Sequence, residues 1–476
     1  MASPLLVEIA NWKLEAKLED NSRYFFHFSE VEMIQGGARC YVLGRKGSGK
    51  TAISEHLHGS RSHNVFSQKL SFKNFPFRDL YDLRNDRFNS PNQYITLWKY
   101  LIYSSIAKQM AENQMVDSSV RAMLAEIYAD DPAASLPRTI GRWTSRNFGV
   151  SVLGTGVSGT AARLFADTET TWVERVEILE RLLEEHLDDS KYLVLFDELD
   201  EDYKDATAGE EQQLYNALLT SLFKAVQDVK ALFPRHRYDV VPVVFLRDDI
   251  FDQLKDADRT KWRDLAITLT WSEPEIRQLL AHRISRAADP HGEPSAFGTA
   301  WSTVFQAGTV TMPDGRTLEI FGQMQRGSHG RPRDFIKYLQ ACAQVALARG
   351  APTVSGDTFR RADDSYSAYL RGELEDEIHP VLPEIRQIMD VLSAVRKQVF
   401  RIDEFEEAYK SSIKKGLIPL RDTEHVLGVL FHFSIIGNQP SQKNATVFKH
   451  RNPAARLNTN EKITVHRGLF KALQIL

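Results

Sequence analysis

The chain has 476 residues, of which 42% are hydrophobic and 26% are charged, and this is the balance of a globular protein with several domains. Its 60 Lys and Arg residues against 63 Asp and Glu residues give a net charge of −3, which excludes a chain that is basic throughout but not a local basic patch. The cysteines Cys40 and Cys342 lie far apart, so we expect neither a disulfide scaffold nor a cysteine zinc site, and we expect a cytoplasmic protein.

The first twenty residues lack a basic segment ahead of their apolar stretch and become acidic early, so they do not predict a secretory signal. No window approaches the roughly 18 apolar residues that a membrane-spanning helix needs. The sequence therefore predicts a soluble chain with no membrane association.

A glycine-rich loop follows the first predicted strand, residues 40–43, and precedes a predicted helix that opens at residues 52–57. It matches G-x-x-x-x-G-K-[ST] in the strand–loop–helix setting that this motif requires. Backbone N–H groups of such a loop surround phosphates. We expect Lys50 to reach the β- and γ-phosphates and Thr51 to ligate Mg²⁺. The expected nucleotide-binding residues of the loop are Gly44, Arg45, Lys46, Gly47, Ser48, Gly49, Lys50, Thr51 and Ala52.

The stretch before the next motif is long and predicts an insertion at about 60–170. Within it we expect a strand near 66–72 and a helix near 93–110. The glycine-rich residues 148–160 predict a plain loop rather than a second phosphate loop, because no lysine follows the glycines.

An apolar strand is predicted to end in the two carboxylates Asp197 and Glu198. Alone, such a run is more often a strand that meets a solvated loop, but beside the phosphate loop it indicates a nucleotide site. We expect Asp197 to organise Mg²⁺ and Glu198 to polarise the attacking water. A helix at 210–232 leads to a third strand at 240–246, so the crossover predicts a parallel sheet and a doubly wound α/β P-loop NTPase core.

Two helices are predicted downstream of the core. One begins at a capping box, Ser272 to Glu275, and another begins at the Gly-Arg-Pro-Arg run 330–333 and ends near Gly350. They predict a helical domain of about a hundred residues after the core.

The last hundred residues predict helices at 385–395, 403–412 and 423–435 and strands at 445–450 and 462–466, which is the winged-helix pattern. From residue 409 onward, eleven basic residues stand against three acidic ones, a net charge of +8 that can neutralise phosphates. The third helix is too apolar to lie in a major groove. If DNA is bound, the better candidates are Lys449, Arg451 and Arg456. The alternative is a regulatory packing module.

This order of motifs resembles the AAA+ ATPases, and among them the origin-recognition and STAND branches with a C-terminal winged helix. The resemblance implies an ATPase core with an N-terminal extension at 1–270, a helical lid at 271–378 and a winged-helix domain at 379–476. It implies catalytic roles for Arg247 in the sensor-1 position and Arg333 in the sensor-2 position, beside Lys50 and Glu198. The alternatives are ion pairs, of Arg247 with Asp248 or Asp249, and of Arg333 with Asp334.

The run Val465-His466-Arg467 resembles the Met-His-Asp element of STAND proteins, which implies that His466 contacts the β-phosphate of a bound nucleotide. The alternative is a surface histidine at a strand end. Arg259 and Arg263 are candidates for an arginine finger that acts on a neighbouring subunit, and the alternative is a solvated charged loop.

The resemblance implies an enzyme that uses ATP and Mg²⁺ and whose nucleotide state controls self-assembly or engagement of a partner effector protein, as in the ATPase arm of bacterial anti-phage systems. One alternative is a DNA-binding initiator or loader that uses its basic C-terminal region. Another is a non-hydrolysing scaffold, which the intact residues Lys50, Thr51, Asp197 and Glu198 disfavour.

Overall fold

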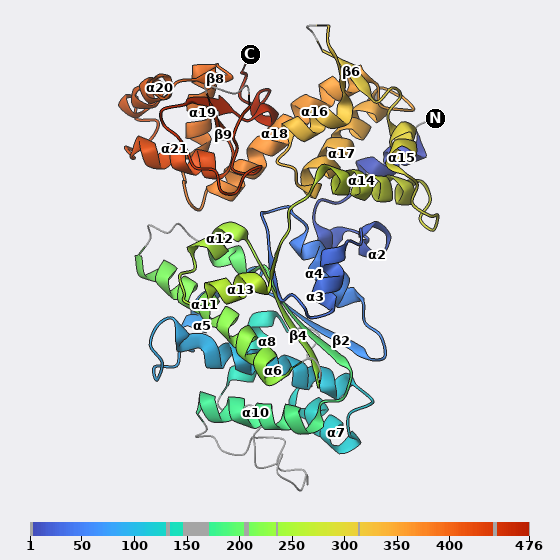
Figure 1. The fold of residues 1–476 in the computed structure, drawn as a ribbon, viewed down its shortest axis with the longest axis vertical. Coiled ribbons are helices and arrows are strands. Elements are labelled where there is room, and N and C mark those ends of the chain that lie inside the picture. The colour runs from blue at the N-terminus through green and yellow to red at the C-terminus, as the bar shows by residue number, and fades with distance from the viewer. Residues whose placement is uncertain are drawn as a thin grey trace. The chain divides into compact units, whose positions relative to one another are not determined.

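The structure is a computed structural model that forms two compact units (Figure 1). We call them the sheet unit, His27–Arg45 with Gly49–Leu269, and the helical unit, Met1–Phe26 with Lys46–Ser48 and Thr270–Leu476. The residues that the structure describes are 3–129, 134–145, 171–203, 209–234, 237–312, 315–440 and 445–475. The loop predicted at 148–160 lies outside them.

The sheet unit is built on five parallel strands in the order β2-β3-β4-β1-β5. Their bounds are β1 Tyr41–Leu43, β2 Val65–Ser71, β3 Lys191–Asp197, β4 Asp239–Leu246 and β5 Ala266–Thr268. The apolar side chains of β1, β3 and β4 are buried, as expected of parallel strands covered on both faces. The predicted doubly wound α/β fold is confirmed.

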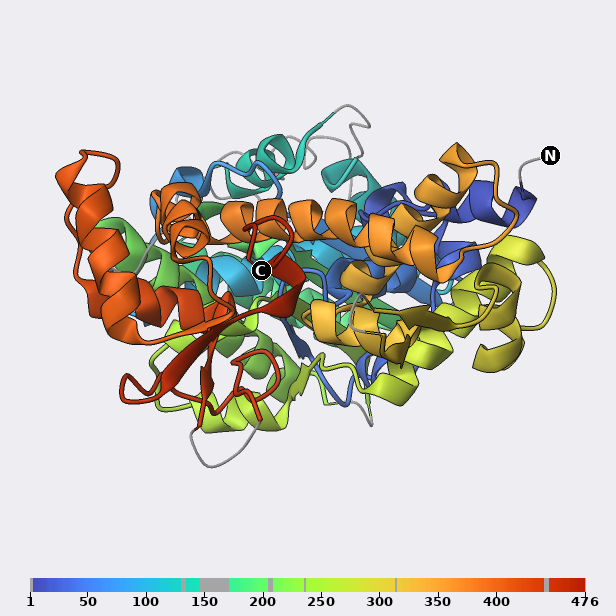
Figure 2. The same cartoon turned by 90° about the horizontal axis from the view of Figure 1, so that it is seen from above.

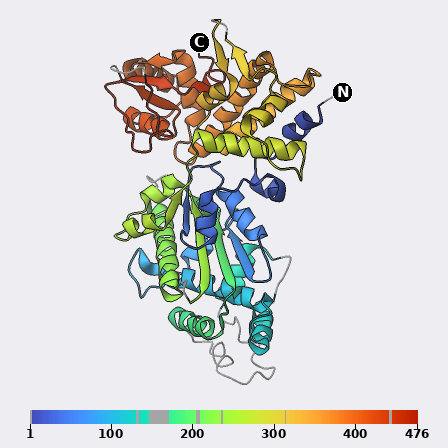
Figure 3. The ribbon, with the colours of Figure 1, turned by 45° about the vertical axis from the view of Figure 1, so that its right-hand side comes forward.

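Helices cover both faces of this sheet. α4 packs against β2, β3 and β4, whereas α6 packs on β2 and β3 and α11 on β4; Figures 1 and 3 show α4 and α11 on opposite sides. Because β2 pairs with β3 along its whole length, it belongs to the central sheet, and the inserted stretch begins after it. Within the described residues, the helices of the unit are α3 Ser29–Gln35, α4 Lys50–Gly59, α5 Phe77–Tyr81, η2 Asn92–Tyr94, α6 Ile95–Glu112, α7 Ser118–Ile127, α8 Leu136–Thr144, α10 Trp172–His186, η4 Leu199–Asp202, α11 Gly209–Leu232, α12 Asp248–Gln253 and α13 Arg259–Asp264.

The helical unit joins the beginning of the chain to its second half. α1 packs on α14 and α17 and buries Leu6 and Ile9. The first 26 residues therefore belong to the helical unit, whereas we expected the N-terminal extension to belong with the P-loop core. Its elements up to residue 378 are α1 Pro4–Ala10, η1 Ala16–Leu18, α2 Asn21–Tyr24, α14 Glu273–Ala288, α15 Phe297–Val304, β6 Thr309–Thr311, β7 Thr317–Glu319, α16 Ile320–Gly327, α17 Pro332–Ala348 and α18 Gly356–Ile378.

The predicted helix starts in this unit are confirmed. The Ser272 side chain accepts from the backbone N–H of Glu275 in a capping box, and Pro332 is the first residue of α17. Gly350, just after the end of α17, has φ +65°, a left-handed conformation that glycine adopts without strain. α18 is the long helix that runs along the unit in Figure 2.

The described residues after α18 form three α-helices and a three-stranded antiparallel sheet in the order β8-β10-β9. The bounds are α19 Ile385–Val395, β8 Val399–Phe400, α20 Ile402–Lys414, α21 Thr423–His432, β9 Ile436–Gln439, β10 Lys462–Val465 and η5 Arg467–Leu469. The strand predicted at 445–450 is wrong, since only Val447 forms a bridge, with Asn438. Residues 448–452 form a turn, in which Asn452 N donates to Phe448 O. The strand that pairs with β10 on this side is β9.

Cys40 and Cys342 are both buried free thiols. Burial raises the pKa of Cys40 to about 12. Among the described residues, no helix combines the length and apolar character that crossing a bilayer requires.

Candidate functional site

The glycine-rich loop leads from β1 directly into α4, as predicted. Gly47 has φ +82° and Gly49 has φ +104°, and side chains with a Cβ rarely adopt either conformation. The two glycines therefore allow the tight turn of the loop that leads directly into the first turn of α4. The N-terminus of this ten-residue helix favours an anion.

Lys50, the first residue of α4, folds back over the loop. Its Nζ donates to Gly44 O at 2.7 Å and to Arg45 O at 3.1 Å. Burial lowers the pKa of Lys50, and the nearby carboxylates of Asp200 and Asp248 oppose this effect. The two carbonyl groups thus hold the Lys50 ammonium at the loop. In a P-loop a bound phosphate would take their place as its partner.

Asp197 is the last residue of β3 and is 2% exposed. Its Oδ2 lies 3.0 Å from Nζ of Lys69, which also lies 2.8 Å from Glu55 Oε1. Burial raises the pKa of Asp197, while Lys69 lowers it. Burial alone would lower the pKa of Lys69, but its two carboxylate partners outweigh burial and raise it. We therefore regard this as an ionised pair at the carboxyl end of the sheet.

Glu198 follows Asp197 in a left-handed backbone conformation, φ +60° and ψ +36°. Its Oε2 accepts a hydrogen bond from the hydroxyl of Ser71, at the end of β2. A non-glycine residue at positive φ is uncommon and is found often at functional sites. The turn directs the Glu198 carboxylate to the same strand that supplies Lys69.

Lys69 and Ser71 were not predicted from the sequence as residues of this site. Both lie on β2, two residues apart, and therefore on one face of the strand. A signal was present, because Ser67, Lys69 and Ser71 form a polar alternation within the strand predicted at 66–72. What the sequence did not reveal is that β2 pairs with β3, some 120 positions later, in a register that sets Ser71 opposite Asp197.

Arg247 follows β4, the strand between β1 and β3. The carboxyl ends of parallel strands meet at one edge of the sheet, so Arg247 shares an edge with the phosphate loop and Asp197. Its guanidinium forms a bidentate pair with Asp249, at 3.0 Å and 2.6 Å, and lies over the ring of Tyr203. The ion-pair alternative with Asp249 is therefore the arrangement observed.

Two arginines of the Gly-Arg-Pro-Arg run differ sharply. Arg331 is 3% exposed and its guanidinium contacts Asp334 at 3.0 Å and Glu377 at 3.3 Å. Arg333, the predicted sensor-2 residue, retains a 24% exposed side chain and pairs with Glu373 at 3.3 Å. Asp334, the alternative partner expected for Arg333, thus pairs with Arg331, and the burial of Arg331 was not predicted from the sequence.

Part of the loop, Lys46–Ser48, clusters with the helical unit. Arg331 Nη1 donates to Lys46 O at 3.0 Å, and a Cβ on Gly47 would meet Arg333 Cβ at 3.2 Å. Gly47 is therefore the residue that lets the Arg333 side chain approach this part of the backbone.

His466 is 1% exposed, so the alternative of a surface histidine is wrong. It precedes η5 and accepts from Gly468 N through Nδ1 at 3.2 Å. Its ring packs against His329 and His450. The predicted contact with a β-phosphate stays a prediction.

Arg259 and Arg263 lie on α13, so the segment is a short helix and not a loop. Both contact the Asp252 carboxylate, at 2.6 Å and 3.6 Å. Arg259 also lies over the ring of Phe251. A role as an arginine finger stays a prediction for each.

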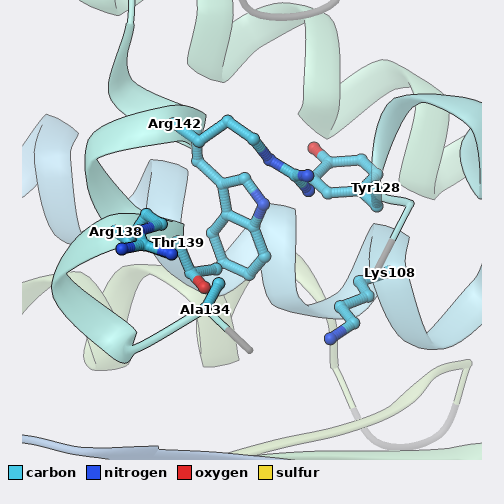
Figure 4. A pocket seen from close by; sticks show the side chains of 7 residues that line it. Lys108, Tyr128, Ala134, Arg138, Thr139 and Arg142 are labelled. Atoms are coloured by element: carbon cyan, nitrogen blue, oxygen red, sulfur yellow. The ribbon is translucent and has the colours of Figure 1, made fainter. Parts of the chain in front are cut away.

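A small pocket in the sheet unit has basic and aromatic walls (Figure 4). Its lining includes Lys108, Tyr128, Arg142 and Trp143. These residues come from the α6–α8 part of the chain, and none belongs to the phosphate loop or to the end of β3.

Residues 274–375 match the family described as the FunZ-associated C-terminal helical domain. No curated protein matches the chain. The chain is similar in structure to the Aeropyrum pernix ORC1 protein in complex with DNA, at 13% identity and a TM-score of 0.39, covering 97% of this chain and 96% of the other. It is also similar to the Aeropyrum pernix ORC2 protein in its ADPNP–ADP complexes, at 14% identity and a TM-score of 0.40, covering 94% and 89%. For Cdc6p from Pyrobaculum aerophilum the values are 13%, 0.33, 98% and 96%. With TM-scores below 0.5, these similarities establish neither a family nor an activity for the chain.

Proposed function

We propose that the chain is an AAA+-type ATPase whose nucleotide state controls self-assembly or engagement of a partner protein. The observation that supports this most is the shared edge of the sheet. The phosphate loop with Lys50 follows β1, Asp197 ends β3 with Glu198 directly after it, and Arg247 follows β4, the strand between β1 and β3. A P-loop ATPase needs these groups together. From the resemblance to bacterial ATPases of anti-phage systems, we further propose that the partner is an effector protein of such a system.

The residues present fit a nucleotide with Mg²⁺. Gly47 and Gly49 shape a loop that closes around phosphates, and the buried Asp197 already faces a cation, Lys69. Thr51 and Asp197 would hold Mg²⁺, which supplies charge neutralisation on the phosphates. Lys50 would bind the phosphates, and Glu198 would orient the attacking water and accept its proton.

Phosphate release from ATP tests the enzyme activity. We expect Lys50→Ala to abolish nucleotide binding and hydrolysis, and Glu198→Gln to retain binding but lower the turnover number by about 100-fold or more. Lys73→Ala, at an exposed position just after β2, is the matched control and should hydrolyse ATP as the unaltered chain does. Equal hydrolysis by Lys50→Ala and the control would refute an ATPase.

Light scattering with size-exclusion chromatography tests the switch. The Glu198→Gln chain should form larger assemblies with ATP than with ADP, because the ATP state persists. Through the lid, Arg333 would sense the γ-phosphate, so Arg333→Ala should weaken this assembly while leaving ATP binding within a few-fold. An assembly state that does not depend on nucleotide contradicts the switch.

A second candidate, DNA binding by the C-terminal elements as a winged helix, has a specific observation in its favour. Arg456 lies at an exposed position. Partial burial lowers the pKa of Arg451, and the nearby positive charge of Arg326 lowers it further, so Arg451 and Arg326 are two neighbouring cations of the kind that attract phosphates. α21 buries its large apolar side chains, Val426, Leu427, Val429, Leu430 and Phe431, so this apolar face is not available for a groove. Charge reversal at Lys449 and Arg451 should weaken duplex binding at low salt, and unchanged binding excludes this function.

A further inference from the structure

Three histidines from separate segments meet inside the helical unit. His329 lies in the turn between α16 and α17, His450 in the segment between β9 and β10, and His466 between β10 and η5. His329 is 4% and His466 is 1% exposed, and His450 is half-buried. One ligand nitrogen of each ring lies within 4.8 Å of the others.

We propose that these three histidines bind a divalent transition metal ion, with Zn²⁺ as the first choice. Imidazole nitrogens suit Zn²⁺, Co²⁺, Ni²⁺ and Cu²⁺, whereas Mg²⁺ and Ca²⁺ require oxygen ligands. The site is therefore chemically distinct from the Mg²⁺ site proposed at Thr51 and Asp197. Three protein ligands leave a fourth position of a tetrahedron for water or another small ligand.

The spacing suits a metal after small ring rotations. With Zn–N bonds of about 2.0–2.1 Å, a tetrahedral ion holds its nitrogen ligands about 3.4 Å apart, which is somewhat closer than the 4.8 Å limit observed. The His329 and His450 rings stack with centroids 4.8 Å apart, and His466 meets His329 edge-on at 4.6 Å. Rotation about χ2, a broad torsion in histidine, is the motion that would bring the ligand nitrogens to the separation that a tetrahedral ion requires.

The backbone of each histidine is fixed independently of the rings. His329 N donates to Asp334 Oδ2 at 2.9 Å, His450 N donates to Ser434 Oγ at 2.9 Å and His466 N donates to Ile435 O at 2.8 Å. Fixed backbones lower the ordering cost of binding, because only ring torsions remain to be set.

Phe448 also borders the cluster and packs against His450 at 5.5 Å and His466 at 5.3 Å between ring centroids. An apolar wall limits water and strengthens metal–ligand bonds. The Gly468 N–H donates to Nδ1 of His466, so a metal at Nε2 would shift the ring proton to Nδ1 and displace this hydrogen bond. Metal binding would therefore alter the N-terminal cap of η5.

Metal content and Co²⁺ spectroscopy of the full, tag-free chain test the proposal. After removal of metal by chelator and reloading with Zn²⁺, elemental analysis should find one tightly held ion per chain. Co²⁺ in its place should give the intense visible absorption of a tetrahedral site. We expect His450→Gln to raise the Zn²⁺ Kd by at least about 100-fold, since loss of a supporting partner alone costs about 10–100-fold.

His291→Gln, at an exposed histidine of the same unit, is the matched control and should bind as the unaltered chain does. His450 is chosen because it is the least buried of the three, and circular dichroism of the metal-free variant verifies that it folds; His329→Gln provides a second ligand test. A chain that retains no Zn²⁺ after desalting overturns the proposal. Zn²⁺ affinity or a Co²⁺ spectrum unchanged in folded His450→Gln also overturns it, and would leave the rings as a packed aromatic cluster.

Discussion

Replacing Lys69 with methionine removes the cation beside Asp197 while keeping a side chain of similar length. Lys69 is 7% exposed and Asp197 is 2% exposed, so the remaining carboxylate has little access to water. Removing one partner of a buried ion pair typically costs about 3–5 kcal/mol of folding free energy. The second partner, Glu55, is 23% exposed and adds less, since solvent screens it.

Protonation of Asp197 limits how much folding free energy the Lys69→Met chain can lose, because a neutral carboxyl avoids the cost of a buried charge. Each pH unit above the ordinary pKa of 3.8 for Asp197 corresponds to about 1.4 kcal/mol, so the ceiling is about 4 kcal/mol at pH 7 and about 1.6 kcal/mol at pH 5. Burial raises the pKa of Asp197, and without Lys69 nothing in the pair opposes that rise. A carboxyl with a raised folded-state pKa stabilises the fold at low pH, and this contribution is lost as the pH rises through that pKa. We therefore expect Lys69→Met to lose about 3–4 kcal/mol at pH 7 but under about 2 kcal/mol at pH 5.

Urea unfolding followed by circular dichroism at pH 5 and pH 7 measures both values. Lys73→Met, at an exposed position of the same segment, should change the free energy of unfolding by less than about 0.5 kcal/mol. Adding Asp197→Asn to Lys69→Met should restore most of the loss, because no buried charge is left. A cost for Lys69→Met that is below about 1 kcal/mol, or equal at the two pH values, would refute the reasoning.

Two further pairs of variants test the helical unit by thermal unfolding. Arg331→Lys should cost about 2–3 kcal/mol, because a lysine cannot reproduce the forked contacts of the buried guanidinium, whereas Arg333→Lys should cost less than about 1 kcal/mol at its more accessible position; equal losses would contradict the difference in burial. Gly468→Ala should cost about 3 kcal/mol or more, because its Cβ would lie 2.0 Å from Gly327 O. Gly428→Ala, with no atom within 4 Å of its Cβ in α21, should instead stabilise the fold by about 0.5–1 kcal/mol, and the reverse order would show that the close approach at residue 468 is not a constraint.

Local chemistry explains which features the sequence predicted well. The predicted helix 210–232 agrees with α11 to within one residue, because its apolar stripe is long and continuous. The capping box that begins at Ser272 and the Gly-Arg-Pro-Arg run at the start of α17 are each a signal contained within four consecutive residues. The phosphate loop and the carboxylates after β3 were also found, since each motif is contiguous.

Features that depend on pairing distant segments were not predictable in the same way. Lys69 contacts Asp197 only because β2 pairs with β3. Neither strand's own sequence indicates which strand it will pair with. β9 was missed because four residues containing a glycine carry little periodicity. The histidine cluster unites residues 329, 450 and 466, whose spacing along the chain resembles no metal motif.

The packing of α1 on α14 and α17 has a consequence for the order in which the chain folds during synthesis. Leu6, Ile9 and Trp12 leave the ribosome about 270 residues before the helices that bury them. At a synthesis rate of about 5–20 residues per second, at least roughly ten seconds pass between the synthesis of these side chains and that of α14. The sheet unit is made in this interval and can fold. During this time the N-terminal segment exposes apolar surface of the kind that chaperones shield, and its docking on α14 and α17 would complete the core of the helical unit.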